Sequence, residues 1–347
     1  SMACSRAVLP SMKRGESGAC LVIGVDKPEG MSSHDVVNAC RRIFGERRVG
    51  HTGTLDPLAS GALTVCVGPA TRLDAYMVGH DKTYDVRISF GAATDTDDRC
   101  GEVARTADVP AQVCDPDFAE VVLRGFVGKQ KQMPPAYSAI KKGGVKACDA
   151  ARKGNVIALE PRDIEVYSAE LLDLERDPRA DSIWWDVRFS VSKGTYIRAL
   201  ARDVGAACDT CAHVESLRRV RAGVLDVEDC MSLQMVERYG LDAAIDPVFL
   251  LGYRMAFLSE PAYADVCNGK SLRASELAVF EAPHRFDADD CGPRRCAVPA
   301  TDPLRDGECV CLVHGNDMKA IYAYDAKTGK VSPRCVFSQG VTRGKSL

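Results

Sequence analysis

The clearest pattern along the chain is an alternation of apolar and polar residues over 82–90. Tyr84, Val86, Ile88 and Phe90 are apolar, and the residues between them are polar. This two-residue period is typical of a strand that buries one face. Apolar, β-branched and aromatic content predicts further strands at Val22–Val25, Ile183–Val191, Cys309–His314, Lys319–Tyr324 and Val331–Phe337.

Two other segments show the period of an amphipathic helix. The first follows a turn at 27–30, where Ser32 or Ser33 can cap a helix whose apolar positions 36, 40, 43 and 44 share one face. The second follows Gly194 and places apolar residues at 197, 200, 201 and 204 on one stripe. Because strands and helices do not alternate regularly, a doubly wound parallel sheet is disfavoured and an α+β fold is predicted.

The length of 347 residues suggests two domains. Beyond residue 250 the chain changes to short strands separated by turn-rich, acidic loops. We predict a loose leader over 1–18, a catalytic or binding domain over 19–249 and a small β-rich domain over 250–347. No apolar run approaches the ~18 residues that span a bilayer, and no hydrophobic core follows the first basic residues. A soluble, cytoplasmic protein is therefore expected.

The charge and the cysteines narrow the classes of function. A net charge of −3 excludes binding of polyanions by bulk charge alone, but it leaves room for local basic clusters. The 16 cysteines are scattered, and only Cys208 and Cys211 form a C-x-x-C pair, with no partner pair at zinc spacing. We predict reduced thiols and no metal. The acidic run Asp95–Gly101 does not match an EF-hand loop, so a solvated turn is predicted there.

The loop over 47–61 carries the best candidate for chemistry. Asp56 precedes Pro57 and lies between the apolar residues Leu55 and Leu58. A carboxylate held stiffly among apolar neighbours suits nucleophilic or acid–base catalysis. An aspartate before a proline is also a common turn former, so spacing alone leaves both interpretations open. P-loop and G-x-S-x-G motifs are absent, which argues against those classes of nucleotidase and hydrolase.

Residues 50–61, GHTGTLDPLASG, resemble the catalytic motif of the TruB family of tRNA pseudouridine synthases. Five further segments, in the same order along 21–235, resemble motifs of that family. They are Asp26–Ser33, Lys82–Tyr84, Met133–Lys141, Ser192–Arg198 and His213–Arg219.

The resemblance implies a pseudouridine synthase fold, with a central mixed, mainly antiparallel sheet flanked by helices and a small β-rich, PUA-like C-terminal domain. It implies conversion of uridine 55 in the T-loop of tRNA to pseudouridine without metal, nucleotide or redox cofactor. Asp56 would attack the ribose or the base, and Arg198 would form an ion pair with it in an enclosed site. Tyr84 would stack on the extracted uracil, although alternation alone would make it a core tyrosine.

Other residues are implied in substrate binding. His51 would hold or displace the target nucleotide, Leu217 would pack the pocket floor, and a thumb-like insertion near 130–155 would grip the T-loop. The pattern over Gly144–Asp149 departs from the family, which puts the detailed thumb contacts in doubt. The further substrate-binding residues are Lys27, Arg48, Lys82, Lys141, Lys142 and Lys146.

The sequence leaves three hypotheses for the function. The first is a stand-alone tRNA pseudouridine synthase, expected to be a monomer without a membrane, protein partner or guide RNA. The second is a non-catalytic protein that binds or folds tRNA on the same scaffold. The third is a guide-RNA-dependent synthase, against which the Met133–Lys141 motif argues. The stretch 281–306 matches nothing in the family and is predicted to be a long surface loop.

Overall fold

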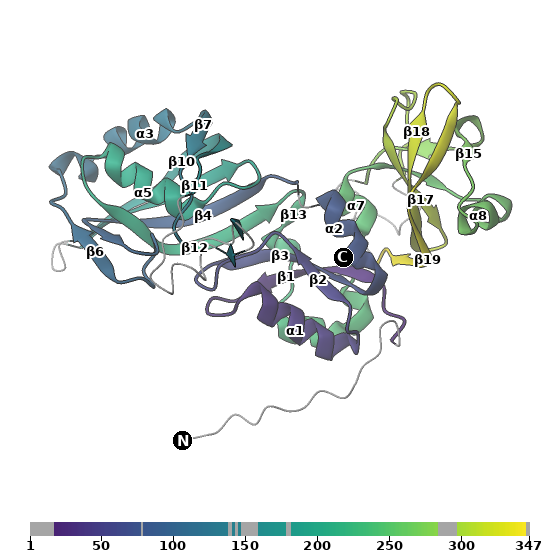
Figure 1. The fold of residues 1–347 in the computed structure, drawn as a ribbon, viewed down its shortest axis with the longest axis horizontal. Coiled ribbons are helices and arrows are strands. Elements are labelled where there is room, and N and C mark those ends of the chain that lie inside the picture. The colour runs from purple at the N-terminus through teal and green to yellow at the C-terminus, as the bar shows by residue number, and fades with distance from the viewer. Residues whose placement is uncertain are drawn as a thin grey trace, which may run out of the picture.

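The structure is a computed structural model that describes residues 17–77, 79–137, 141–142, 145–146, 159–177, 182–283 and 297–344. Two separate sheets dominate it, a nine-stranded sheet in the first part of the chain and a six-stranded sheet at the C-terminal end (Figure 1). Helices flank the larger sheet, which confirms the predicted α+β class.

The nine-stranded sheet is mixed and mainly antiparallel, as predicted. Its one parallel pair joins β3 to β12, with Arg219 opposite Gly61. In β4 the predicted alternation is confirmed, because Tyr84, Val86 and Ile88 are all buried. The main path of the sheet is β1 (Leu21–Lys27), β3 (Ser60–Val67), β12 (Ala212–Ala222), β4 (Lys82–Phe90), β11 (Ser182–Val191), β10 (Arg162–Asp177) and β7 (Gly128–Gln132). Off this path, β2 (Val49–Thr52) pairs with β3 and β13 (Leu225–Asp226) pairs with β12.

Helix α1 (Ser33–Phe44) begins where the sequence predicts. Ser32 is its N-cap and forms a capping box with Asp35, so Ser33 is the first helical residue. The helix ends at Gly45, which adopts the left-handed conformation with φ +58° that glycine tolerates best. Its buried face packs into the same core as β1 and β3.

Helices α3 (Pro116–Gly125) and α5 (Ile197–Ala207) lie over β10, β11 and β4 in the view of Figure 1. Trp185 of β11 is fully buried beneath them, and its indole Nε1 donates to the Val113 carbonyl at 2.9 Å. The predicted helix after Gly194 is α5, whose apolar stripe is buried. This packing fixes the N-terminal turn of α5, which carries Arg198.

The six-stranded sheet confirms the predicted β-rich C-terminal region. Its strands follow the order β15 (Leu272–Arg273), β19 (Lys330–Thr342), β18 (Asp317–Asp325), β17 (Cys309–His314), β14 (Arg254–Phe257) and β16 (Val279–Phe280). The predicted loop over 281–306 lies partly outside the described residues. Within the described part, Pro299 forms a bridge to Phe280, which ties that end of the segment to β16.

The two sheets meet through a shared apolar cluster. Cys20, just before β1, and Val22 of β1 pack in the same cluster as Met318 and Phe337 of the C-terminal sheet. Arg72 crosses the junction, where it donates to the Val336 carbonyl at 2.7 Å and lies over the Phe337 ring. The two parts of the chain that carry these sheets are therefore joined by this apolar cluster.

The remaining elements include two short two-stranded sheets, β5 (Ala92–Thr94) with β6 (Val103–Thr106) and β8 (Lys141–Lys142) with β9 (Val145–Lys146). Beyond the 3-10 turns, the others are the helices α2 (Asp74–Met77), α6 (Leu233–Tyr239), α7 (Pro247–Leu251) and α8 (Glu260–Cys267). No helix among the described residues is long and apolar enough to cross a membrane.

Candidate active site

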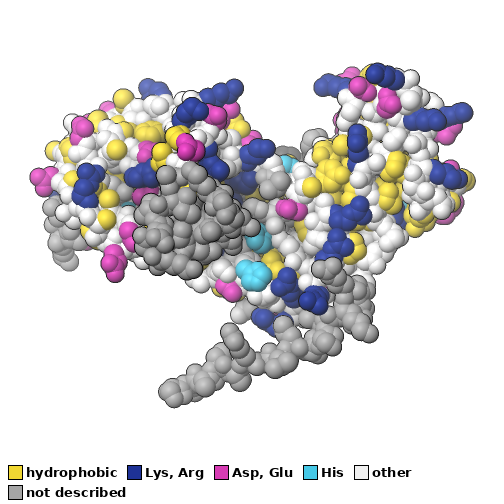
Figure 2. All heavy atoms as spheres, in the orientation of Figure 1, with side chains coloured by type: hydrophobic (Ala, Val, Ile, Leu, Met, Phe, Trp, Pro, Cys, Tyr) yellow, Lys and Arg dark blue, Asp and Glu magenta, His cyan; other side chains and the backbone are white. Residues whose placement is uncertain are grey.

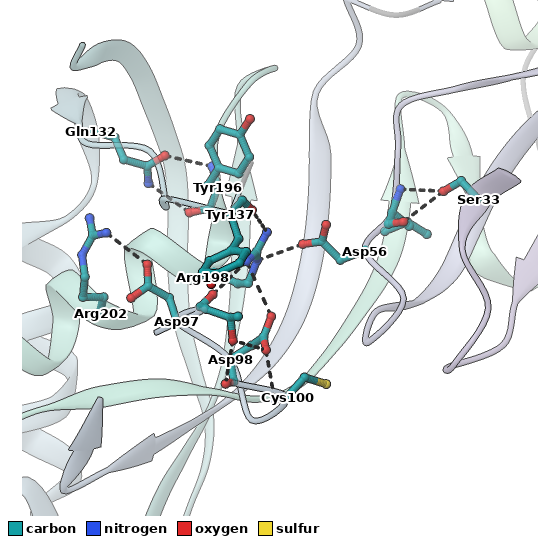
Figure 3. A network of polar contacts seen from close by, with 12 residues as sticks. Ser33, Asp56, Asp97, Asp98, Cys100, Gln132, Tyr137, Tyr196, Arg198 and Arg202 are labelled. Atoms are coloured by element: carbon teal, nitrogen blue, oxygen red, sulfur yellow. Dashed lines mark hydrogen bonds and ion pairs between the residues drawn. The ribbon is translucent and has the colours of Figure 1, made fainter. Parts of the chain in front are cut away.

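Asp56 lies on the loop between β2 and β3, and the loop is anchored from both sides of this residue. Leu55 is buried, and its backbone N–H and carbonyl both pair with the hydroxyl of Ser33 at the start of α1, at 2.9 and 3.0 Å (Figure 3). On the other side, the Gly30 amide donates to the Pro57 carbonyl at 2.8 Å. The predicted stiffness of this loop is present in the structure.

The expected enclosure of Asp56 is not found. Its side chain is 41% exposed, although the apolar residues on either side are buried. The neighbours Leu55 and Leu58 point into the core and leave the carboxylate at the surface of the loop. Asp56 is therefore open to a substrate in this structure.

The predicted ion pair between Asp56 and Arg198 is present. The Nε of Arg198 lies 2.9 Å from Oδ2 of Asp56 (Figure 3). Arg198 comes from the first turn of α5, and its side chain is only 6% exposed. The Nε–H is not aligned on the oxygen, so the contact is electrostatic and Nε has no hydrogen-bond partner. Burial of the cation strengthens its field at the carboxylate.

Three further groups hold the Arg198 guanidinium. Its Nη1 donates to the Thr96 carbonyl at 2.8 Å, and its Nη2 donates to the Tyr137 carbonyl at 3.0 Å (Figure 3). The carboxylate of Asp98 lies 3.6 Å from Nη1. These contacts fix the orientation of the planar guanidinium toward Asp56.

Asp98 was missed by the sequence analysis. The run Asp95–Gly101 was predicted to be a solvated turn, but Asp98 is buried, and its Oδ1 accepts hydrogen bonds from the Thr96 hydroxyl and the Cys100 amide at 2.7 and 3.0 Å. The turn itself is present, and Asp95, Arg99 and Cys100 are exposed, so the prediction is wrong for Asp98 alone. Asp98 is buried because β12 packs beside this turn, with Arg99 N donating to the Val214 carbonyl. The concentration of aspartates was the only signal, and it is equally common in exposed turns.

Tyr84 is buried in β4, between Phe189 of β11 and Arg219 of β12. It belongs to the large apolar core around the nine-stranded sheet. Among the described residues its hydroxyl makes no hydrogen bond. The structure thus places Tyr84 as a core residue with an unused polar end.

Three basic residues near the Asp56 loop are buried to differing degrees. Burial lowers the pKa of His51, and the nearby charge of Arg219 lowers it further. Burial also lowers the pKa of Lys82 to about 8 and that of Lys27 to about 8, while Asp56 opposes the shift at Lys27. A lowered pKa favours the neutral form of each group, which is the form that burial penalises less.

Matches to known proteins extend over this constellation. Residues 41–197 match the profile described as "TruB family pseudouridylate synthase (N terminal domain)", and residues 198–250 match "tRNA pseudouridylate synthase B C-terminal domain". The chain is 41% identical over 257 residues to "tRNA pseudouridine synthase B" of Mycobacterium ulcerans, covering 74% of this chain and 84% of that protein. The protein of the same name from Geobacillus thermodenitrificans is 37% identical over 283 residues, covering 82% of this chain and 92% of that protein.

The chain belongs to the TruB family of pseudouridine synthases. The predicted family is confirmed, and with it the class of enzyme, an isomerase. Two solved structures share the fold. They are "Structure of H/ACA RNP bound to a substrate RNA containing 2'-deoxyuridine" (TM-score 0.62, 23% identity, 91% of this chain and 84% of that chain) and "Crystal Structure of a Cbf5-Nop10-Gar1 Complex" (TM-score 0.61, 24% identity, 91% and 84%). They confirm the pseudouridine synthase fold.

Lys27 of this TruB-family protein has no exposed surface. Its ammonium donates to the Pro28 and Met31 carbonyls at 2.9 and 2.6 Å. In this structure it supports the turn beside the Asp56 loop. Lys82 donates to the His80 carbonyl. Neither ammonium is free on the surface.

The other sequence-predicted binding residues are placed to different extents. Leu217 is buried in β12 and belongs to the large core, and Arg48 donates to the Thr71 hydroxyl at 2.7 Å. Lys141 and Lys146 lie opposite each other in a short antiparallel pair, β8–β9. The side chains of Lys141, Lys142 and Lys146 lie outside the described residues.

One group of carboxylates has the spacing of metal ligands within the described part of the chain. It comprises Asp173, Glu175 and Asp186, on β10 and β11. The Arg87 guanidinium lies 2.8 Å from Glu175 and 2.6 Å from Asp186, so two of the three carboxylates already share a cation. This group takes no part in the arrangement around Asp56.

Proposed function

We propose that this chain converts uridine 55 in the T-loop of tRNA to pseudouridine, with Asp56 as the nucleophile. The observation that carries the proposal is the contact between an exposed carboxylate and a buried guanidinium at 2.9 Å. Because the guanidinium stabilises the anionic carboxylate, Asp56 is ready for nucleophilic attack. The relatives named tRNA pseudouridine synthase B support tRNA as the substrate.

The reaction is an isomerisation, so its atoms balance without a co-reactant. The Asp56 carboxylate adds to C1′ of the ribose or to C6 of the uracil, and the N1–C1′ bond breaks. The ring turns so that C5 bonds to C1′, after which the adduct with Asp56 breaks. C5 loses its proton and N1 gains one, so no redox or nucleotide cofactor is required.

Tyr84 and His51 are proposed to receive the target base after it leaves the stack of the loop. The hydroxyl of Tyr84 has no protein partner among the described residues, and its ring lies at the end of β4 that begins with Lys82. The Nδ1 of His51 is buried without a hydrogen-bond partner. An aromatic face and an unused ring nitrogen suit a uracil that has lost its stacking and pairing contacts.

A line of arginines supports RNA binding beside this site. We call Arg47, Arg48, Arg72 and Arg334 the arginine seam. Arg48 contacts Thr71, and Arg72 donates to the Val336 carbonyl at 2.7 Å, so the seam runs from the residues just before β2 to β19. None of the four forms an ion pair with a carboxylate among the described residues. Figure 2 shows Lys and Arg side chains running onto the C-terminal sheet from beside histidines. Unpaired arginines are suited to phosphates.

The remaining assignments follow from this function. We propose residues 19–249 as the catalytic domain, with the thumb near 130–155, and 250–347 as an RNA-binding domain. The chain would act as a monomer in the cytoplasm, without a guide RNA or protein partner. The shared apolar cluster between the two sheets supports a single working unit.

Release of tritium from tRNA that carries [5-³H]uridine tests the proposal, because formation of the C5–C1′ bond expels the hydrogen on C5. Wild type should release tritium, whereas Asp56→Asn, which keeps the size of the side chain, should release none and still bind tRNA. Asp117→Asn is the matched control, since Asp117 is an exposed aspartate in the first turn of α3. No release by wild type with tRNA bound would favour the alternative, a protein that binds or folds tRNA without modifying it.

A further inference from the structure

Arg219 joins the two ends of the loop that carries Asp56. It lies on β12 with only 1% of its surface exposed. Its Nη2 donates to the Gly53 carbonyl at 3.0 Å, and its Nε donates to the Ala62 carbonyl at 2.7 Å. These carbonyls lie three residues before and six residues after Asp56. One rigid guanidinium therefore contacts both ends of the loop.

The backbone of Arg219 approaches the same loop closely. Arg219 is opposite Gly61 in the parallel pair of β12 and β3. A Cβ at Gly61 would lie 2.2 Å from the Arg219 carbonyl oxygen, and Gly61 has φ +108°. Only glycine allows this approach. Main chain and side chain of Arg219 therefore act on the same segment.

The charge of Arg219 is unusual for a buried arginine. It forms no ion pair with a carboxylate among the described residues, and its neighbours include other cations. Its charge adds to burial in lowering the pKa values of Lys27, His51 and Lys82. A buried cation without a carboxylate relies on hydrogen bonds for stabilisation. Its side chain donates to the carbonyls of Gly53 and Ala62, so the stability of the charge depends on the shape of the loop.

We propose that Arg219 is a positioning residue for the isomerisation. It holds the ends of the loop 53–62 so that Asp56 stays at ion-pair distance from Arg198, which approaches from α5 on the other side. The inference rests on the proposed role of Asp56. Arg219 itself is buried and does not touch the substrate. Its loss would allow the loop to shift, and a misplacement of about 1 Å can cost about 10²-fold in rate.

The test compares Arg219→Met and Arg219→Lys with wild type in single-turnover tritium release. Arg219→Met should lower the rate constant by about 10- to 100-fold, with the Kd for tRNA changed by less than about twofold. Arg219→Lys keeps the charge but loses the planar fork, so its rate should also fall, because one ammonium cannot match both carbonyls. Guanidinium chloride at millimolar concentration should restore part of the rate of Arg219→Ala. In Arg219→Met, amide hydrogen exchange over 54–60 should be faster than in wild type.

Arg343→Met is the matched control for loss of a buried arginine. Arg343 is 4% exposed and pairs with Asp246 in the C-terminal half, away from the Asp56 loop. The Arg343→Met variant should be less stable than wild type, but its folded molecules should release tritium with the wild-type rate constant. An unchanged rate in folded Arg219→Met or Arg219→Lys would overturn the inference, as would a loss fully explained by the unfolded fraction. Activity of Asp56→Asn would instead overturn the proposed function. The hydrogen-exchange measurement on the loop does not depend on catalysis, so it would still report whether Arg219 holds the loop.

Discussion

Arg198 and Asp56 form an asymmetric ion pair, in which the cation is buried and the anion is open. The guanidinium side chain is 6% exposed, and the carboxylate that it meets at 2.9 Å is 41% exposed. A surface ion pair of two exposed groups would be weakened by water and salt. Burying only the cation keeps its field directed at Asp56 and leaves the carboxylate accessible to a nucleotide.

Replacement of Arg198 tests this arrangement. Arg198→Lys keeps a positive charge but cannot bond the Thr96 and Tyr137 carbonyls while facing Asp56. We expect the rate constant for tritium release to fall by about 10²- to 10³-fold, in the range found when one preorganised electrostatic contact is removed. The Kd for tRNA, measured by filter binding, should change little. A rate within threefold of wild type would contradict the assigned role.

Asp98 should act through Arg198. Asp98→Asn keeps the shape and the hydrogen bond from the Cys100 amide, but it removes a negative charge 3.6 Å from Nη1. The longer distance predicts a smaller effect than that of Arg198, about 10-fold in rate. Asp203→Asn is the control, because Asp203 is paired with Arg202 at 3.0 Å. Equal losses in the two variants, measured by single-turnover tritium release, would show that Asp98 has no specific role.

Lys27 should make the stability of the protein increase with pH in mildly alkaline solution. Burial lowers its pKa from the usual 10.5 to about 8, so between these values the unfolded chain binds more protons than the folded chain. Stability therefore rises with pH across this window, by at most about 1.4 kcal/mol per pH unit for one lysine. Below about pH 8 the cost of the buried charge is present in full.

Thermal unfolding of wild type and Lys27→Met from pH 7 to 10 measures this contribution. The melting temperature of wild type should rise relative to that of Lys27→Met as the pH increases. The pKa of Lys82 is also about 8, so the melting temperature of wild type should rise with pH relative to that of Lys82→Met as well. A constant difference between wild type and Lys27→Met over the whole range would contradict the assigned shift.

The arginine seam should contribute phosphate contacts outside the Asp56 loop. Arg47 and Arg334 are exposed and have no ion pair among the described residues. Each neutral replacement, Arg47→Gln or Arg334→Gln, should reduce the slope of log K against log salt by about 0.9. Single-turnover tritium release at saturating tRNA should be unchanged. Arg273→Gln is the control, because Arg273 is exposed but lies 3.7 Å from Glu276.

Local structure and family membership could be predicted from the sequence because the signals for them are local. The alternation around Tyr84 sets the buried face of β4, and Ser32 and Gly45 mark the ends of α1. The motif around Asp56 indicated the family. Arg198 was predicted as the partner of Asp56 because of the resemblance to that family, since the spacing of the two residues in the sequence does not indicate a contact. These features depend on side-chain type and on neighbours within a few positions.

The tertiary structure decided the environment of each charge. Asp56 was expected to be enclosed and is open, whereas Asp98 was expected to be solvated and is buried against the strand that follows α5. Arg219 matched a family motif, but nothing in that motif showed that its guanidinium joins both ends of the Asp56 loop. Burial and hydrogen-bond partners depend on which distant segments pack together. A charged side chain has the same identity in water and in a core, and only packing determines which of the two it meets.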